Sequence, residues 1–287
     1  MPATPNASAG TILTPSGTTG LNRTVYSATF FRTTYQRQIA VPIFEDGERL
    51  YGSTVLRKEQ RVPAAALAQS SDGTGVTYLN PVGSHVTVTP GGFIAPIGWS
   101  ENEEAQVDFN MDKIAGDAAA SSLAELIESN TLANFQSGTQ IISNPTLDAP
   151  TLRAAIARLD QNTNGESGPG PGIGKTIYGF FSSTQRVPLM SIPEVNSAEA
   201  RGDSENPYVK GVWVRGFGIV ANITSVIAQD ANGYHNGVCL AEAVTVRWNT
   251  RSRIKRQDYE YRNAYYGFAN LGSALVYDAR LVVVRTT

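Results

Sequence analysis

The strongest chemical signal in the sequence is a cluster of cationic side chains at 247–262. Six basic residues stand there against Asp258 and Glu260, which leaves a local net charge of +4, and tyrosines and a tryptophan are interspersed among them. Such a segment is typical of a surface that contacts phosphate groups. It also fits a β-hairpin whose charges pair with acidic groups of a neighbouring subunit or face solvent. The basic residues are Arg247, Arg251, Arg253, Lys255, Arg256 and Arg262.

A glycine-rich segment at 168–176 partly matches the phosphate-binding loop of nucleotide-binding proteins, because Gly174, Lys175 and Thr176 correspond to the end of that motif. The motif also needs a glycine five residues before Gly174, and Pro169 stands there without an N–H for a phosphate. A helix is expected before this loop and a strand after it, which reverses the order of the motif. We therefore interpret the segment as a solvent-exposed loop.

Histidine and cysteine, common as metal ligands and catalytic groups, are scarce in this chain. The sequence has two histidines, His85 and His235, and one cysteine, Cys239. His235 and Cys239 stand four residues apart, but two ligands do not make a zinc site without others. One cysteine excludes a disulfide within the chain, and Cys239 is expected to be a small buried apolar residue. We predict no catalytic residue, no metal and no cofactor.

The overall composition indicates a substantial core and a sparsely charged surface. Of the 287 residues, 41% are hydrophobic and 17% are charged, where about a quarter is usual for charged residues. The net charge of −2 gives no general attraction to nucleic acid or anionic membranes. No apolar run approaches the roughly 18 residues of a membrane-spanning helix, so we expect no membrane partner. The segment 1–22 is rich in proline, glycine, serine and threonine and predicts a flexible arm.

The elements that would position these residues include one long helix, predicted at Glu101–Phe135. Four acidic residues near its start suit the positive end of a helix dipole, and apolar residues then recur three or four positions apart. About 25 helical residues at ~1.5 Å each would span about 40 Å, whereas helices average about 11–12 residues. We expect its polar residues, Asp112, Ser121 and Glu125 among them, to meet solvent, DNA or a neighbouring subunit.

Most of the remaining chain shows strand patterns. Residues 50–99 form two alternating arms around a polar connection, with too few apolar residues for a core of their own. A second helix should begin at Asp148, a capping residue, with Pro150 in its first turn. Further strands are expected within 176–181, 212–227, 241–248 and 274–284 because β-branched and aromatic residues dominate there.

This order of elements resembles the major capsid protein of tailed bacteriophages, which has the Hong Kong 97-like fold. Three stretches carry the resemblance. The first runs from Val86 to Ile97 and leads into the acidic start of the long helix, and the second is the alanine-rich part of that helix, Ala118–Glu128. The third is C-terminal and comprises Tyr265–Gly267, Ala274–Val276 and Leu281–Val284.

The resemblance implies an α+β chain with an N-terminal arm, an extended β loop, a spine helix with a peripheral β-sheet, and an axial αβ domain. By analogy, 1–49 is the arm with the first strands, 50–99 the extended loop and 100–135 the spine helix. Residues 136–240 would be the axial domain, which gathers around five- and six-fold axes, and 241–287 the closing β section of the peripheral domain.

The function implied is that of a structural head protein, not an enzyme. Copies would assemble through pentamers and hexamers into an icosahedral shell that encloses double-stranded DNA by non-specific contacts, in a virion built in the host bacterial cytoplasm. The expected partners are further copies of the chain, a portal, a decoration protein and a separate scaffolding protein, since the arm is short for an internal scaffold. The basic cluster at 247–262 would face the DNA or a neighbouring subunit.

Two other functions fit parts of the sequence. An encapsulin-like nanocompartment would share the fold but enclose a protein cargo instead of DNA. A β-rich enzyme or adhesin would instead use the loops at Gly168–Lys175 or Arg201–Asp203.

Overall fold

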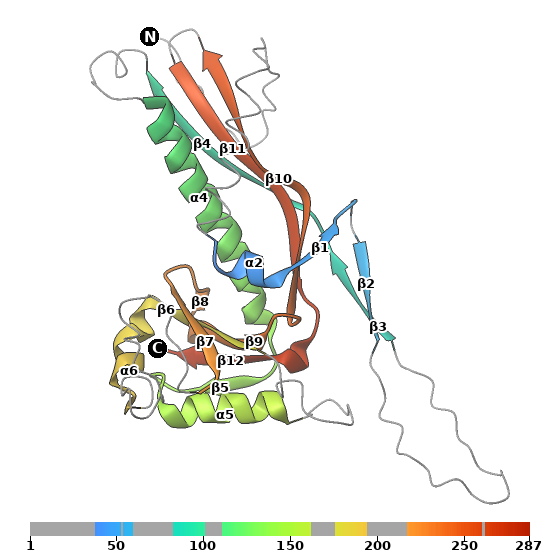
Figure 1. The fold of residues 1–287 in the computed structure, drawn as a ribbon, viewed down its shortest axis with the longest axis vertical. Coiled ribbons are helices and arrows are strands. Elements are labelled where there is room, and N and C mark those ends of the chain that lie inside the picture. The colour runs from blue at the N-terminus through green and yellow to red at the C-terminus, as the bar shows by residue number, and fades with distance from the viewer. Residues whose placement is uncertain are drawn as a thin grey trace, which may run out of the picture.

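The computed structural model describes residues 38–52, 54–59, 83–100, 111–161, 176–193, 217–259 and 262–287. They form an elongated molecule with one sheet toward each end and a two-stranded ribbon projecting from one side (Figure 1). The predicted α+β class is confirmed.

The predicted long helix is α4, Met111–Ala133. It runs beside the long strands in the upper half of Figure 1, which we call the upper body. Its 23 residues span about 35 Å at ~1.5 Å per residue. Alanine and leucine side chains on one face, such as Ala119 and Leu123, are fully buried, whereas Ser122 and Glu125 on the other face are exposed. The helix is therefore amphipathic, and it ends in the 3₁₀ turn η1, Asn134–Ser137.

The polar residues predicted to lie on the outside of α4 follow this pattern only in part. Glu125 is exposed, as expected, while Ser121 is half-buried and donates a hydrogen bond to the carbonyl of Asp117 at 2.9 Å. The expected acidic start at 101–110 and the side chain of Asp112 lie outside the described residues.

The peripheral sheet packs one face on α4. Its strand order is β1 (Glu45–Arg49), β10 (Val244–Tyr259), β11 (Arg262–Leu275) and β4 (Gly91–Ser100). β1 runs parallel to β10, and the other pairs are antiparallel. Because side chains alternate along a strand, Val246 and Ile254 of β10 reach the core beneath α4 while Arg253 and Lys255 point to the opposite face.

The axial sheet lies in the lower body and has the order β5, β12, β9, β6 and β7, with the short strand β8 paired to β9. Helix α5, Ala149–Asp160, covers one face through Leu152, Ala155 and Leu159. Its predicted cap is confirmed, since the Asp148 carboxylate accepts a hydrogen bond from the Thr151 N–H at 2.8 Å. The strands are β5 (Ile141–Ser143), β6 (Ile177–Ser182), β7 (Ile219–Thr224), β8 (Gln229–Asp230), β9 (Gly233–Leu240) and β12 (Leu281–Thr286).

The last strand, β12, belongs to the axial sheet, whereas the sequence division grouped 241–287 with the peripheral section. β12 pairs with β5 on one side and with β9 on the other. Leu281 and Val283 enter the core shared with α4, and Val282 and Val284 enter the core beneath α5. A segment that is buried on both faces is apolar at successive positions, which explains the run Leu281–Val284 in the first part of this strand.

The projecting ribbon consists of β2 (Thr54–Glu59) and β3 (Gly83–Val88), which pair antiparallel. It leaves the upper body near a small apolar cluster formed by Leu50, Val88 and Ala274. The strand that follows, β4, pairs with β11 instead of extending the ribbon. Of the predicted 50–99 excursion, the strands described as paired with each other are therefore 54–59 and 83–88.

The remaining described elements are short. Helix α2, Ala40–Phe44, lies against α4 and leads directly into β1. The turn η2 (Ser183–Gln185) and helix α6 (Arg186–Ser191) follow β6, and η3 (Asp278–Arg280) precedes β12.

Three phenylalanines join the upper and lower bodies. Phe44 of α2, Phe135 of η1 and Phe180 of β6 have ring centroids 5.4 to 6.3 Å apart, within the range of favourable aromatic pairs. All three are essentially fully buried. The two sheets therefore share one continuous core at the end of α4.

Candidate functional site

The six predicted cations all lie on the β10–β11 hairpin, but their side chains have different surroundings. Arg247 and Arg251 contact acidic residues of β1, and Arg253 and Lys255 point away from α4 into solvent. The backbones of Arg256 and Arg262 stand near the hairpin end, in register with Tyr265 and Tyr259. Their side chains lie outside the described part of the molecule.

Arg247 is a buried cation with two carboxylate partners in its own chain. Its Nε lies 2.5 Å from Asp46 Oδ2 and its Nη2 2.7 Å from Glu48 Oε2. Arg251 Nη2 lies 3.1 Å from Glu45 Oε1. The sequence had suggested acidic partners on a neighbouring subunit or solvent exposure. For Arg247 and Arg251 the partners are instead about 200 residues earlier in the same chain.

These ion pairs tie β1 to the edge of the peripheral sheet. β1 is short and carries four charged side chains out of its five residues, Glu45, Asp46, Glu48 and Arg49, so apolar burial contributes little to holding it. Charge-assisted hydrogen bonds to a partly buried arginine supply that attachment. The positive charge of Arg247 is consequently compensated within the subunit.

Arg253 and Lys255 remain as exposed cations on the open face of the sheet. The guanidinium carbon of Arg253 lies 5.4 Å from the centre of the Phe268 ring, which is a cation–π geometry. Phe268 and Arg253 are register partners on β11 and β10. This part of the predicted cluster has the composition of a contact surface.

A buried acid on α4, which sequence reasoning missed, holds the start of α2. Glu128 Oε1 accepts a hydrogen bond from the Ala40 N–H at 2.7 Å, and the Ile39 N–H lies 3.2 Å from both carboxylate oxygens. Burial raises the pKa of Glu128, while the backbone N–H groups of α2 act in the opposite direction. The sequence did indicate that Glu128 would be buried. It lies next to Ile127 and three positions before Thr131, and both of these residues are on the buried side of the helix.

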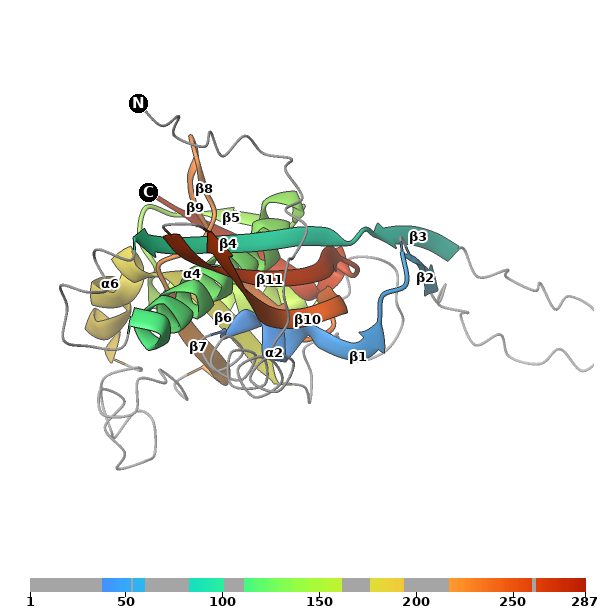
Figure 2. The same ribbon diagram turned by 90° about the horizontal axis from the view of Figure 1, so that it is seen from above.

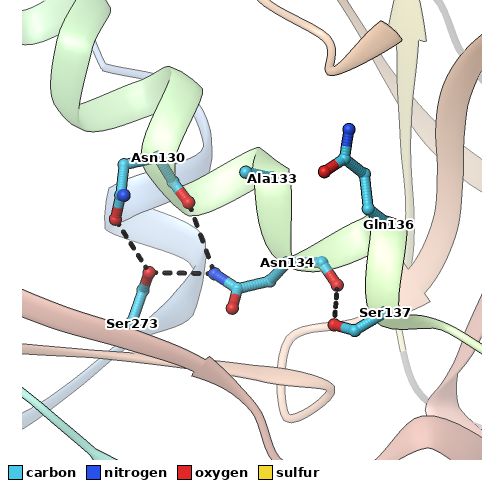
Figure 3. Close-up of a pocket in the computed structure, with 6 residues that line it drawn as sticks. All are labelled: Asn130, Ala133, Asn134, Gln136, Ser137 and Ser273. Atoms are coloured by element: carbon cyan, nitrogen blue, oxygen red, sulfur yellow. Dashed lines mark hydrogen bonds between the residues drawn. The ribbon is translucent and has the colours of Figure 1, made fainter. Parts of the chain in front are cut away.

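A shallow polar depression lies where α4 passes into η1, and Figure 3 shows the residues that line it. Asn134 Nδ2 donates hydrogen bonds to the Thr131 carbonyl at 2.9 Å and to Ser273 Oγ of β11 at 2.8 Å. Ser273 Oγ in turn lies 3.3 Å from Asn130 Oδ1. These uncharged groups mostly satisfy each other, so we assign them a structural role in fastening the end of α4 to the sheet.

The histidine and cysteine of β9 do not form a metal site. Four residues along a strand separate His235 and Cys239 by roughly 13 Å, and burial raises the pKa of the Cys239 thiol. His235 is buried and its Nε2 lies 2.9 Å from Asp230 Oδ2. The pKa of Asp230 is lowered, first by a hydrogen bond from the Asn232 N–H and then by His235. The pair fastens the β8–β9 turn.

Three further kinds of feature were considered in the sequence: metal ligands, a membrane-spanning helix and two loop motifs. Within the residues that the structure describes, no group of three or more histidine, cysteine, aspartate or glutamate side chains could hold a metal ion. No helix in these same ranges is long and apolar enough to cross a membrane. Residues 168–175 of the glycine-rich loop, and Arg201–Asp203, lie outside the described residues.

Comparison with known proteins gives similarity in structure but not in sequence. No protein-family model matches the chain, and no curated protein matches it. A structure of Mycobacterium phage Che8 superposes with a TM-score of 0.65 at 10% identity and covers 86% of this chain and 90% of that one. The head structure of Helicobacter pylori bacteriophage KHP40 gives a TM-score of 0.64 at 10% identity, with 85% and 87% covered.

A third similar structure is a virus-like particle from Pyrococcus furiosus. It superposes with a TM-score of 0.57 at 13% identity and covers 93% of this chain and 100% of that one. In all three cases the similarity covers most of both chains. The chain therefore has the Hong Kong 97-like fold of the phage capsid proteins.

Proposed function

We propose that this chain is the major capsid protein of a tailed bacteriophage. Copies assemble through pentamers and hexamers into an icosahedral shell that encloses double-stranded DNA. The observation that carries the proposal is the structural similarity, over 85% or more of the chain, to structures named for a phage, a phage head and a virus-like particle. A structural role also agrees with the candidate site, because most of its described polar groups form ion pairs or hydrogen bonds with other groups of the same chain.

The shape of the subunit supports assembly. The β2–β3 ribbon extends away from both sheets and has one small apolar cluster at its base (Figure 1). A two-stranded ribbon is marginally stable alone in water, so it gains burial when it lies on another copy. We assign β2–β3 as the extended loop, α4 with the four-stranded sheet as the peripheral domain, and the sheet containing β5 to β9 and β12 as the axial domain.

A nanocompartment that encloses a protein cargo is the second candidate. It has less support, because it rests on the similarity to one structure named a virus-like particle, whereas the other two structures are named for phages and superpose with higher TM-scores. The two candidates differ in what the shell contains and share the subunit fold. A portal, a scaffolding protein and a decoration protein are partners of the first candidate only.

Expression of the chain alone, followed by size-exclusion chromatography and electron microscopy, tests the shared proposal. Closed shells or rings are expected. A monomer that stays compact and dispersed at high concentration would contradict both candidates. The ratio of absorbance at 260 and 280 nm of purified shells then separates nucleic acid from protein content, and mass spectrometry identifies a protein cargo.

The basic cluster can be tested for DNA contact with the double substitution Arg251→Glu and Arg253→Glu. If these side chains line the interior, shells form but retain less DNA. If they lie at a subunit contact, assembly fails before packaging. Arg247 and Arg251 already pair with carboxylates of β1 in their own chain, so this compensation favours neither outcome. Lys255→Arg, which preserves charge on the same strand, serves as the control.

A further inference from the structure

The β2–β3 ribbon joins the upper body through two connections that come from opposite edges of the peripheral sheet. β1 precedes β2 and β4 follows β3, and these two strands are the outermost ones of the sheet. Figure 2 shows β3 running into β4 along one line, whereas β1 reaches the ribbon from the other side. The pair of the ribbon closest to both connections is Thr54 with Val88. The few residues at this root therefore decide the direction of the ribbon.

The two connections differ in how firmly they hold the chain. On the β1 side, Leu50 is fully buried and its N–H donates a hydrogen bond to the Trp248 carbonyl at 2.9 Å. The two residues that follow are exposed, and Gly52 has a φ of 68°, which only glycine adopts readily. On the β3 side, Val88 is fully buried and the ring of Pro90 fixes its φ. The β3 side is therefore the stiffer connection and determines the direction.

Gly272 of β11 lies directly against this root. A Cβ at position 272 would stand 2.7 Å from the Thr89 carbonyl oxygen, 2.7 Å from Val88 Cγ1 and 3.0 Å from Leu50 Cδ2. All three distances are shorter than an ordinary contact, which begins at 3.4 Å. Leu50 and Val88 also pack with Ala274, two positions further along β11, in the small apolar cluster. Both connections therefore rest on one strand at a place where a hydrogen atom fits and a methyl group does not.

We propose that Gly272 is a positioning residue that sets the direction in which the β2–β3 ribbon leaves the subunit. The proposal rests on the proposed shell function, in which the ribbon lies on another copy. Gly272 does not have a positive φ, so lack of space, and not backbone strain, requires glycine here. The Thr89 carbonyl belongs to the main chain and cannot turn aside as a side chain can. A larger residue at position 272 therefore displaces the root of β3.

A displacement at the root is magnified along the ribbon. An ordinary contact with the Thr89 oxygen requires a movement of about 0.7 Å, from 2.7 Å to 3.4 Å. Neighbouring strands lie about 4.8 Å apart, so this movement turns the ribbon by roughly 8°. The six residues of β3 extend over about 20 Å, and their far end then moves by ~3 Å. Interfaces between protein copies are packed as closely as protein interiors, so a shift of this size misplaces the ribbon on its neighbour.

A distance measurement in the unassembled subunit tests the root directly. Spin labels on cysteines introduced at Lys58 of β2 and at Glu125 on the exposed side of α4 report the direction of the ribbon. The native Cys239 is buried and stays unlabelled. Gly272→Ala should shift the mean distance by ~2 Å. Gly91→Ala is the matched control at the same root, because a Cβ there makes only ordinary contacts of 3.6 to 3.7 Å, and it should leave the distance unchanged.

Val88→Ala gives a second test that remains informative if Gly272→Ala does not fold. It removes the side chain that lies against Gly272, so the root is held less firmly. The distribution of the same spin-label distance should become about twofold broader, because fewer buried contacts then restrain the ribbon. An unchanged width, or a shift of the mean distance in Gly91→Ala, would overturn the proposal.

Assembly is the functional readout. Gly272→Ala should raise the protein concentration needed for half-maximal assembly about tenfold, whereas Gly91→Ala should stay within about twofold of the original protein. Weaker assembly with an unshifted distance, or normal assembly with a shifted distance, would overturn the proposal while leaving the shell function intact. A complete lack of particles from the unmodified chain would instead contradict the shell function, and the distances in the unassembled subunit would still decide whether Gly272 sets the direction of the ribbon.

Discussion

Glu128 Oε1 accepts a hydrogen bond from the Ala40 N–H at 2.7 Å, across 88 residues of sequence. The carboxylate lies on the buried side of α4, and the N–H belongs to the first turn of the five-residue helix α2. Such a short helix is not stable by itself. Glu128 satisfies N–H groups that α2 cannot pair internally, so one side chain of the spine helix fixes where the N-terminal segment enters the fold.

Replacement of Glu128 by alanine should destabilise the unassembled subunit by about 3 kcal/mol, since the N–H groups of Ile39 and Ala40 would be buried without partners. Glu128→Gln keeps an acceptor oxygen near the Ala40 N–H and should cost less, about 1 kcal/mol. Urea unfolding monitored by circular dichroism measures both values. Glu125→Ala, on the exposed side of the same helix, is the control. Equal losses for the alanine and glutamine variants would contradict the assigned role.

The pH dependence of stability should also depend on Glu128. Burial raises the pKa of Glu128 above its ordinary value of 4.5, so the folded state holds this proton more tightly than the unfolded chain. The stabilising effect of the bound proton is complete below the unfolded-state pKa and is lost as the pH rises through the folded-state pKa. Glutamine cannot ionise. The stability of Glu128→Gln relative to the original protein should therefore increase as the pH rises above 4.5.

Urea midpoints of both proteins across that pH range measure the difference. A constant difference would show that Glu128 has the same pKa in the folded and unfolded chains. A difference that decreases as the pH rises would show that the hydrogen bonds from α2 lower the pKa of Glu128 more than burial raises it.

The Arg247–Asp46 pair should couple the hairpin to β1. Its Nε–Oδ2 distance is 2.5 Å and the Arg247 side chain is 11% exposed. Arg247→Ala and Asp46→Ala, alone and together, form a double-mutant cycle, for which we expect a coupling of about 1.5–3 kcal/mol. Arg251 and Glu45 form a more exposed pair, with the arginine side chain 58% exposed, and should couple by less than about 1 kcal/mol. Coupling of the same size in both pairs would contradict the role of burial.

Gly237 should be essential for the junction between the two sheets. A Cβ at this position would lie 2.5 Å from a carbon of the Phe135 ring, in the aromatic cluster that joins the bodies. Gly237→Ala should therefore destabilise the subunit by about 1–3 kcal/mol through overpacking. Gly92→Ala is the matched control, because a Cβ there meets nothing within 4 Å. Thermal unfolding of the two variants side by side tests the difference.

Local patterns in the sequence were sufficient to predict several elements. The three-to-four-residue period of α4, the Asp148 cap of α5 and the strand β6 all arise from neighbours within a few residues of one another, and the structure confirms them. The burial of Cys239 followed from its apolar neighbours on the same strand and is also confirmed. Propensity, capping and alternation act over short distances, which explains why they can be recognised from the order of residues alone.

The sequence by itself determined that this chain has one long amphipathic helix among many strands, a basic hairpin and few residues suited to metal or covalent chemistry. Only the tertiary structure decided that Arg247 is neutralised by Asp46, that Glu128 holds α2, and that β12 lies between β5 and β9. These relationships join residues far apart in sequence, and hydrophobic burial rewards many pairings of strands equally well. Which pairing occurs depends on the packing of the whole chain, where hydrogen bonds and charges must be satisfied together.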